Sequence, residues 1–265
     1  MSLPKAAQKR LRDHTPPLIL LLALFLVWEG VVLWQEVPTW VLPSPLGIWR
    51  VTWQNATLLG PHILQTVQEM FLGLALALLT GVALAAALDL SAWLRRALYP
   101  LLVISQTIPI LALAPLLIIW FGFGIFPKIL IVALVCFFPI AVNTADGLGA
   151  ADPELLSLLR VMGASRGQLW TKVRLPASLP YFFSGLRIAA TYSVIGAVIG
   201  EWVGASQGLG IYMLRSANAF KTPQVFSTIA ISSLISLALF VLVFAVERML
   251  LPWYHSPQRA AQWEE

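Results

Sequence analysis

The sequence predicts an all-α polytopic membrane protein, in which one chain crosses the lipid bilayer six times and carries a long cytoplasmic loop. Of its 265 residues, 59% are hydrophobic and 11% are charged, and the mean hydropathy is +0.82. Soluble domains contain about a quarter charged residues, so lipid is the solvent that suits this composition. The apolar residues also fall into separate long runs, which is typical of transmembrane helices.

Six apolar runs have the length of about twenty residues that one helical span requires. They cover residues 17–33, 63–88, 97–121, 126–143, 180–203 and 224–251. The first run follows a basic segment, as in a secretory signal, but no small-x-small cleavage site comes after it. We therefore interpret it as a span and expect a single transmembrane domain over residues 1–265.

Basic residues orient the predicted helices. If the N-terminus is inside, 12 of the 17 Lys and Arg residues lie in cytoplasmic segments. Arg187 lies within a span, where we expect it to extend toward the membrane surface. The basic residues in outer segments are Arg50, Lys128, Arg215 and Lys221. Because cytoplasmic loops carry the excess of positive charge, this pattern predicts cytoplasmic N- and C-termini and a cytoplasmic loop over residues 144–179.

Polar residues at similar depth in two spans indicate a candidate translocation pathway. At 1.5 Å per residue, Gln106 and Thr107 lie about 14–15 Å above the inner end of the third span. Thr191, Tyr192 and Ser193 lie about 17–20 Å above the inner end of the fifth span. Polar groups are costly in lipid, so we expect them to face a cavity, with hydrogen bonding between helices as the alternative.

Prolines and glycines modify two of these spans. Pro109 and Pro115 are expected to break the third span just above its polar residues. Gly196, Gly200 and Gly204 lie four residues apart on one face of the fifth span, which allows close helix packing. That packing occurs either across a homodimer axis or within one subunit.

The loop over residues 144–179 contains a predicted amphipathic helix. The run Asp152-Pro153-Glu154 is typical of a helix start, because it supplies a capping carboxylate, an early proline and an acid near the positive end of the helix dipole. Leucines follow at helical spacing, and Gly163 is suited to the turn that ends the helix. We expect one helix over residues 153–162 and a second helical stretch over 165–173. Either a soluble partner binds this loop or the helix lies on lipid headgroups.

The spacing of this loop resembles a known family. From Gly163, nine residues lead to Val173, and Leu175-Pro176 follow after Arg174. This is similar to the Glu-Ala-Ala-x3-Gly-x9-Ile-x-Leu-Pro loop in membrane subunits of ATP-binding cassette (ABC) importers, and Ala164-Ser165 and Leu179-Pro180 extend the match. The chain also resembles one branch of this family, which serves nitrate, sulfonate, taurine and pyrimidine importers. The segments that carry this resemblance are Leu42-Pro43-Ser44-Pro45, 107–115, 120–124 and Gly208-Leu209-Gly210. Residues 183–193 and 200–202 look most like permeases for hydroxymethylpyrimidine precursors of thiamine.

The resemblance implies a type I ABC importer permease fold, with an importer core over residues 62–251. It implies a homodimer of permeases in the bacterial cytoplasmic (inner) membrane, cytoplasmic ATPase subunits bound to the loops, and an extracytoplasmic binding protein that delivers the solute. The chain contains no G-x-x-x-x-G-K-[ST] sequence, which agrees with ATP hydrolysis by a partner subunit. We therefore expect a transport subunit that is not itself an enzyme.

The resemblance also implies roles for individual residues. Where the family has Glu-Ala-Ala, this chain has Ser157-Leu158-Leu159, so Glu154 or Asp152 is the candidate replacement for the missing acid. Glu201 and Arg215 are candidates for an outer gate or for contact with the binding protein, and ordinary interface charge is the alternative. The implied ATPase-coupling residues are Asp152, Glu154, Leu155, Leu158, Leu159, Gly163, Ala164, Ser165, Leu175 and Pro176.

The solute and the remaining functional classes follow from the same comparison. A thiamine pyrimidine precursor is the expected solute, with riboflavin, sulfonate, taurine and nitrate as alternatives. A self-sufficient secondary transporter would show an internal repeat and acids for ion coupling, but the sequence shows no repeat and its acids lie toward span ends. No metal-ligand spacing relates His14, His62 and His255, and Cys136 is the single cysteine. We expect no metal, no cofactor and no nucleic acid.

Overall fold

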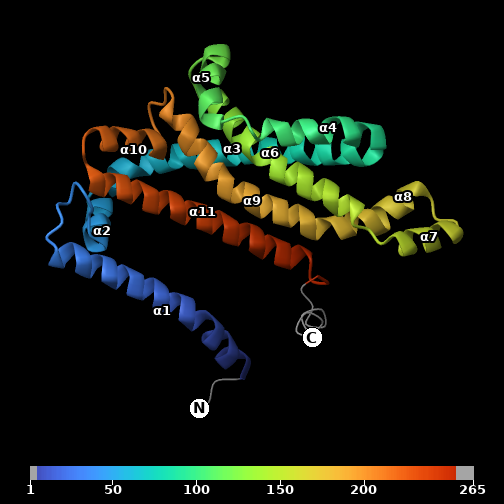
Figure 1. Ribbon diagram of the computed structural model, residues 1–265, viewed down its shortest axis with the longest axis horizontal. Helices are drawn as coiled ribbons and strands as arrows, with labels where there is room; N and C mark the ends of the chain where they lie inside the picture. The colour runs from blue at the N-terminus through green and yellow to red at the C-terminus, as the bar shows by residue number, and fades with distance from the viewer. Residues whose placement is uncertain (1–4, 255–265) are drawn as a thin grey trace. The chain divides into compact units, whose positions relative to one another are not determined.

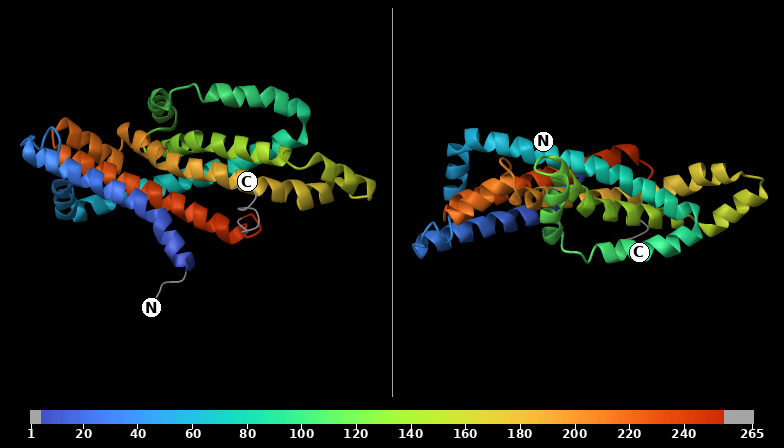
Figure 2. Two further views of the ribbon diagram at one scale, coloured as in Figure 1. Left: turned by 60° about the horizontal axis from the view of Figure 1, so that its bottom comes forward. Right: turned by 90° about the horizontal axis from the view of Figure 1, so that it is seen from above.

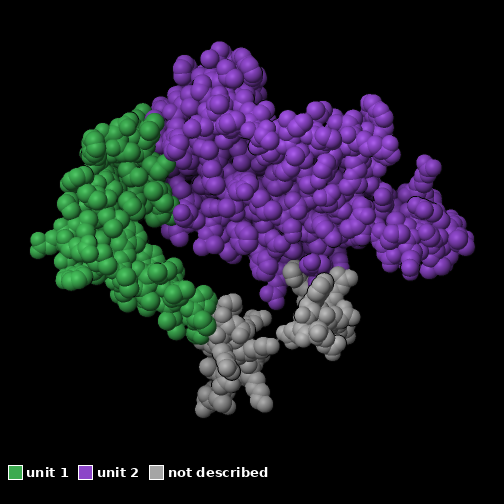
Figure 3. Space-filling model, in the orientation of Figure 1, with its two compact units in different colours: residues 1–60, 212–230 green, residues 61–211, 231–265 purple. Residues whose placement is uncertain are grey.

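The computed structural model describes residues 5–254, with side chains from Thr15 onward. All secondary structure in this part of the chain is helical. The contacts divide the chain into two compact units, residues 1–60 with 212–230 and residues 61–211 with 231–265 (Figure 3). The C-terminus, including Arg259, lies outside the described residues, as does the start of the chain before Lys5.

The first unit contains α1 (Lys5–Trp34), α2 (Pro45–Gln54), most of α10 (Leu209–Asn218) and the first turns of α11 (Thr222–Leu250). α2 begins where expected for its sequence, because Ser44 Oγ accepts a hydrogen bond from the Gly47 nitrogen at 3.1 Å and Pro45 occupies the first turn. The hydroxyls of Thr52 and Ser227 lie 2.7 Å apart and join α2 to α11.

The second unit is built around α6 (Phe126–Gly149), which runs beside α9 (Leu175–Trp202) in Figures 1 and 2. Small residues permit this close packing. A Cβ atom at Gly196 would lie 3.1 Å from the Val132 Cα, and one at Gly200 would lie 3.4 Å from the Lys128 Cα. These two glycines of the predicted stripe therefore pack against α6 of the same chain.

The third expected span is two helices. α4 (Ala92–Ser105) and α5 (Ile110–Phe121) meet at an angle of 98° across a short break. The break lies at residues 106–109, where Pro109 has φ −62° and ψ 114° and precedes the new helix. Pro115 stays inside α5, so the expected second break there was wrong. Its missing N–H costs only one bond, which a membrane helix tolerates.

Helices long and apolar enough to cross a membrane account for the expected spans. Five single helices qualify over the described residues, and the bent pair α4 and α5 would make a sixth. The five segments are Thr15–Trp34, Ala56–Leu90 in α3, Phe126–Gly149, Arg166–Trp202 and Thr222–Leu250. The predicted class, an all-α polytopic membrane protein, is confirmed.

The loop over residues 144–179 is almost entirely helical. It contains the end of α6, then α7 (Pro153–Val161), α8 (Arg166–Leu169), the π-helical turn η1 (Trp170–Arg174) and the start of α9. α9 begins at Leu175, five residues before the predicted span, directly after η1 and with Pro176 as its second residue.

Candidate functional site

α7 has the start and the end that its sequence predicts. Asp152 Oδ1 accepts a hydrogen bond from the Glu154 nitrogen at 2.8 Å. The helix ends at Val161, one residue earlier than expected, and Gly163 follows with φ +86°. The nitrogens of Gly163 and Ala164 donate to the carbonyls of Arg160 and Leu159, each at 3.0 Å, which is the Schellman pattern of a glycine-terminated helix. The turn therefore requires the left-handed backbone that glycine supplies.

The surface of α7 carries unpartnered apolar side chains. No residue of this helix is buried, and Leu155, Leu158 and Met162 are exposed. Their positions at i, i+3 and i+7 put them on one face of the helix. Leu159, four residues after Leu155, borders the same face and is half-buried. An exposed apolar strip of this kind is typical of a binding surface.

The remaining residues of the predicted coupling segment lie in the turn after α7 and at the starts of α8 and α9. Ser165 Oγ accepts from the Gln168 nitrogen at 3.3 Å, and Gln168 Oε1 accepts from the Ser165 nitrogen at 2.8 Å, which forms a capping box at the start of α8. Ala164 is half-buried, and Leu175 and Pro176 form the first turn of α9. These residues therefore fix the direction in which the chain leaves α7.

A second group of polar residues is buried in the same unit and was not predicted as a group. We call it the polar cluster: His62, Thr66, Glu69, Lys128, Glu201 and the backbone of 208–210. Three successive backbone nitrogens at the start of α10 donate to side chains: Gly208 to His62 Nδ1 at 2.9 Å, Leu209 to Thr66 Oγ1 at 2.8 Å, and Gly210 to Glu201 Oε2. Side chains of α3 and α9 therefore cap α10.

The polar cluster contains one buried ion pair. Lys128 Nζ lies 2.8 Å from Glu69 Oε1, and the two side chains are 8% and 0% exposed. Gln65 Nε2 also donates to Glu69 Oε1 at 2.7 Å. Thr66 Oγ1 donates to Glu201 Oε1 at 2.6 Å. The cluster thus joins α3, α6, α9 and α10 through buried polar contacts.

The polar cluster explains the Gly208-Leu209-Gly210 motif. A Cβ atom at Gly208, which has φ +134°, would overlap the Glu201 carboxyl group, and one at Gly210 would overlap the Val198 carbonyl oxygen. Only glycine permits the backbone to approach the buried carboxylate this closely.

The predicted outer-gate residues have different surroundings. Glu201 is fully buried and accepts hydrogen bonds from Thr66 and Gly210, so it offers no surface to a binding protein in this conformation. Arg215 is exposed in the last turn of α10. Lys128, counted among the outer basic residues, is buried in the polar cluster rather than facing solvent.

The predicted pathway residues divide into accessible and inaccessible ones. Gln106 and Thr107 are exposed in the break between α4 and α5, and Tyr192 is exposed on α9. Ser193 is fully buried, and its Oγ donates to the Ala190 carbonyl at 2.7 Å. Thr191 is half-buried and donates to the carbonyl of Arg187 at 3.2 Å. The accessible polar groups of the candidate pathway are therefore Gln106, Thr107 and Tyr192.

Arg187 was expected to extend toward the membrane surface, and the structure corrects this. Its Nη1 lies 2.7 Å from Glu247 Oε2 on α11, and its Nη2 donates to Ser184 Oγ at 3.0 Å. The Glu247 side chain is 2% exposed. A buried carboxylate needs a cation, so Arg187 joins α9 to α11 instead of reaching the lipid headgroups.

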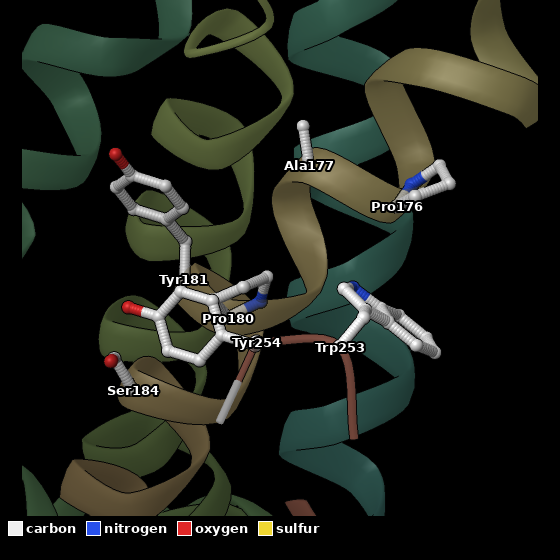
Figure 4. A pocket seen from close by; sticks show the side chains of 7 residues that line it. All are labelled: Pro176, Ala177, Pro180, Tyr181, Ser184, Trp253 and Tyr254. Carbon is white, nitrogen blue, oxygen red and sulfur yellow. The ribbon is translucent and has the colours of Figure 1, made fainter. Parts of the chain in front are cut away.

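A pocket of about 580 Å³ lies where α9 begins and α11 has ended. Figure 4 shows the rings of Tyr181, Trp253 and Tyr254 around it, with Ser184 at its edge. No local pattern predicts this pocket, because Trp253 and Tyr254 follow the last apolar run and are distant in sequence from Tyr181.

The helical architecture defines a polytopic membrane protein with an apolar strip exposed on a loop helix. Residues 73–255 match the family of binding-protein-dependent transport system inner membrane components, and the chain belongs to this family. It is the permease subunit of an ABC importer, as the sequence motifs predicted.

Two curated relatives match nearly the whole chain. The formylaminopyrimidine transport permease protein ThiX of Halalkalibacterium halodurans is 39% identical over 246 residues, covering 92% of this chain and 98% of that protein. The riboflavin transport system permease protein RibX of Chloroflexus aurantiacus is 37% identical over 237 residues, covering 89% and 88%.

A solved structure supports the fold. The crystal structure of an amino acid ABC transporter with histidines aligns with a TM-score of 0.62 and 17% identity, covering 75% of this chain and 97% of that chain. The predicted type I importer permease fold is therefore confirmed at the level of architecture.

Proposed function

We propose that this permease imports a thiamine pyrimidine precursor of the formylaminopyrimidine or hydroxymethylpyrimidine type. The observation that carries the proposal is the similarity to ThiX, which is 39% identical and extends over almost the full length of both chains. Riboflavin is the second candidate, because RibX is 37% identical over a similar length. Both solutes are planar nitrogen heterocycles.

The energy for import comes from a cytoplasmic ATPase that binds α7. The exposed apolar strip of Leu155, Leu158 and Met162 supports this assignment, because burial of such a strip against a partner is favourable. Glu154 is exposed in the first turn and has no ion-pair partner among the described residues, whereas the Asp152 carboxylate caps the helix. Glu154 is therefore the acid that replaces the family glutamate.

The remaining assembly follows from the same family membership. Two copies of the permease form the channel, and an extracytoplasmic binding protein delivers the solute. α7 and both chain ends face the cytoplasm, in agreement with the distribution of basic residues. Gln106, Thr107 and Tyr192 line the pathway, because they are the exposed residues among its candidate polar groups.

Uptake in a defined host tests the substrate. A bacterial host that cannot make the thiamine pyrimidine should grow on hydroxymethylpyrimidine or formylaminopyrimidine when it expresses the permease with its ATPase and binding protein. Labelled pyrimidine uptake should be unaffected by excess riboflavin or taurine. Uptake of labelled riboflavin, and not of the pyrimidine, would assign the second candidate. Failure of tagged permease to recover the ATPase would contradict the importer assembly itself.

A further inference from the structure

Asp89, near the end of α3, forms an ion pair and a hydrogen bond with the segment that follows α7. Its Oδ1 lies 2.9 Å from Arg174 Nη1, and its Oδ2 accepts from Arg174 Nη1 at 3.0 Å and from Trp170 Nε1 at 3.2 Å. The Asp89 side chain is 8% exposed. A nearly buried carboxylate that accepts from two side chains of one turn holds that turn firmly to α3.

The turn that Asp89 holds is unusual. Trp170 and Arg174 are the two ends of η1, in which the Leu175 nitrogen donates to the Trp170 carbonyl. Such π-helical turns are rare and are found frequently at functional sites. The helix is continuous from Arg166 through Trp202, so η1 joins the docking segment directly to α9 (Figure 1).

The ion pair between Asp89 and Arg174 is not a two-nitrogen, bidentate pair. A single guanidinium nitrogen of Arg174 reaches both oxygens of Asp89, and the buried Arg174 Nε has no hydrogen-bond partner among the described residues. A bidentate pair would use two nitrogens and would fix the guanidinium plane. The observed geometry therefore fixes the guanidinium plane of Arg174 less than a bidentate pair would.

α3 leads from this contact to the polar cluster. Asp89 and Thr66 lie on the same helix, about 35 Å apart at 1.5 Å per residue. Thr66 and Glu69 contact Glu201 of α9, Lys128 of α6 and the start of α10. α3 thus connects η1 to these buried contacts through one uninterrupted helix.

We propose that Asp89 is a positioning residue that transmits movement of the docking segment, residues 153–174, to α3. The proposal rests on the proposed docking of the ATPase on α7. Asp89 does not touch the solute or the ATPase in this role. It acts through Arg174 and Trp170, so its loss should separate ATP hydrolysis from solute movement without preventing assembly.

Asp89→Asn tests this role in the complete complex of permease, ATPase and binding protein in liposomes. ATPase recovery with the tagged permease should equal that of the wild type, while solute imported per ATP hydrolysed should fall about tenfold, the effect of losing a charge-assisted hydrogen bond. Asp89→Glu, which keeps the carboxylate, should retain most of the coupling. Size-exclusion chromatography of each variant shows whether it is folded.

A matched control is the pair Arg95–Asp146, which is 3.1 Å long but 44% and 46% exposed. Asp146→Asn should leave solute imported per ATP unchanged, because exposed pairs contribute little. In a double-mutant cycle, Asp89→Asn combined with Arg174→Gln should be no worse than Asp89→Asn, because both changes remove one contact.

Three results would overturn the proposal. Normal import per ATP in Asp89→Asn would show that the contact transmits nothing, even if the ATPase still binds. Loss of ATPase recovery in Asp89→Asn would show that Asp89 only shapes the docking segment. Additive losses in the double variant would show that Asp89 and Arg174 act separately. Failure of the wild-type permease to recover the ATPase would instead contradict the proposed function.

Discussion

Replacement of Lys128 by methionine is the sharpest test of the polar cluster. The Lys128 Nζ–Glu69 Oε1 distance is 2.8 Å, and both side chains are almost completely buried. Methionine keeps much of the aliphatic side chain but removes the cation, so Glu69 would remain buried beside Gln65 as its nearest donor. The Glu69 Oε2 atom already has no hydrogen-bond partner among the described residues.

The expected loss of stability in Lys128→Met follows from the burial of the Lys128–Glu69 pair. Breaking a buried ion pair by removing one partner destabilises a protein by about 3–5 kcal/mol, because an uncompensated charge is left in a medium of low dielectric. The exposed pair Arg95–Asp146 has a similar length but should contribute only about 0–1 kcal/mol. Arg95→Met is therefore the matched control for Lys128→Met.

The free energy of unfolding in mixed micelles of SDS and dodecyl maltoside, followed by tryptophan fluorescence, measures this difference. Lys128→Met should lower the free energy of unfolding by several kcal/mol more than Arg95→Met does. The double variant Lys128→Met, Glu69→Gln should recover part of the loss, because both charges are then absent. The reasoning is refuted if Lys128→Met costs no more than Arg95→Met, or if the double variant shows the sum of both single losses.

Three further predictions concern docking, pathway and topology. Gly163→Val should reduce ATPase recovery and solute uptake, because valine at φ +86° costs about 1–3 kcal/mol, whereas Gly167→Val, at a helical position with open space, should keep both. Equal recovery in the two variants would contradict the role of the turn. Tyr192→Leu should lower uptake but not ATPase recovery, and normal uptake would remove this residue from the pathway. Cysteine at Ser206 should react with an impermeant thiol reagent added outside, whereas cysteine at Ser165 should not; the reverse labelling would invert the topology.

Local sequence signals predicted α7 and the turn after it well. The cap at Asp152, the proline after it and the glycine at Gly163 act within a few residues, and the structure shows the start of α7 and the positive φ that they require. The start of α9 at Leu175 was missed, because a proline in the first turn looks like a break in the sequence.

Charged residues within the spans were identified but not paired. The acids within the spans were expected to lie toward span ends, Glu201 also to form an outer gate or to contact the binding protein, and Arg187 to extend toward the membrane surface. The structure pairs Arg187 with Glu247 and Lys128 with Glu69. The available signal was the cost of an unpaired charge in lipid, which requires a partner but does not name it.

The sequence by itself determined the class of the protein, the helical spans, the family and the turn that ends α7, because hydrophobic runs and helix caps act over short stretches of chain. Only the tertiary structure decided the contacts of the polar cluster and of Asp89. Thr66 and Glu201 are 135 residues apart, and Asp89 and Arg174 are 85 residues apart. Which side chains meet over such separations depends on how the helices rotate and pack, and that is set by many small contacts at once, such as the close approach of α9 to α6 at Gly196 and Gly200.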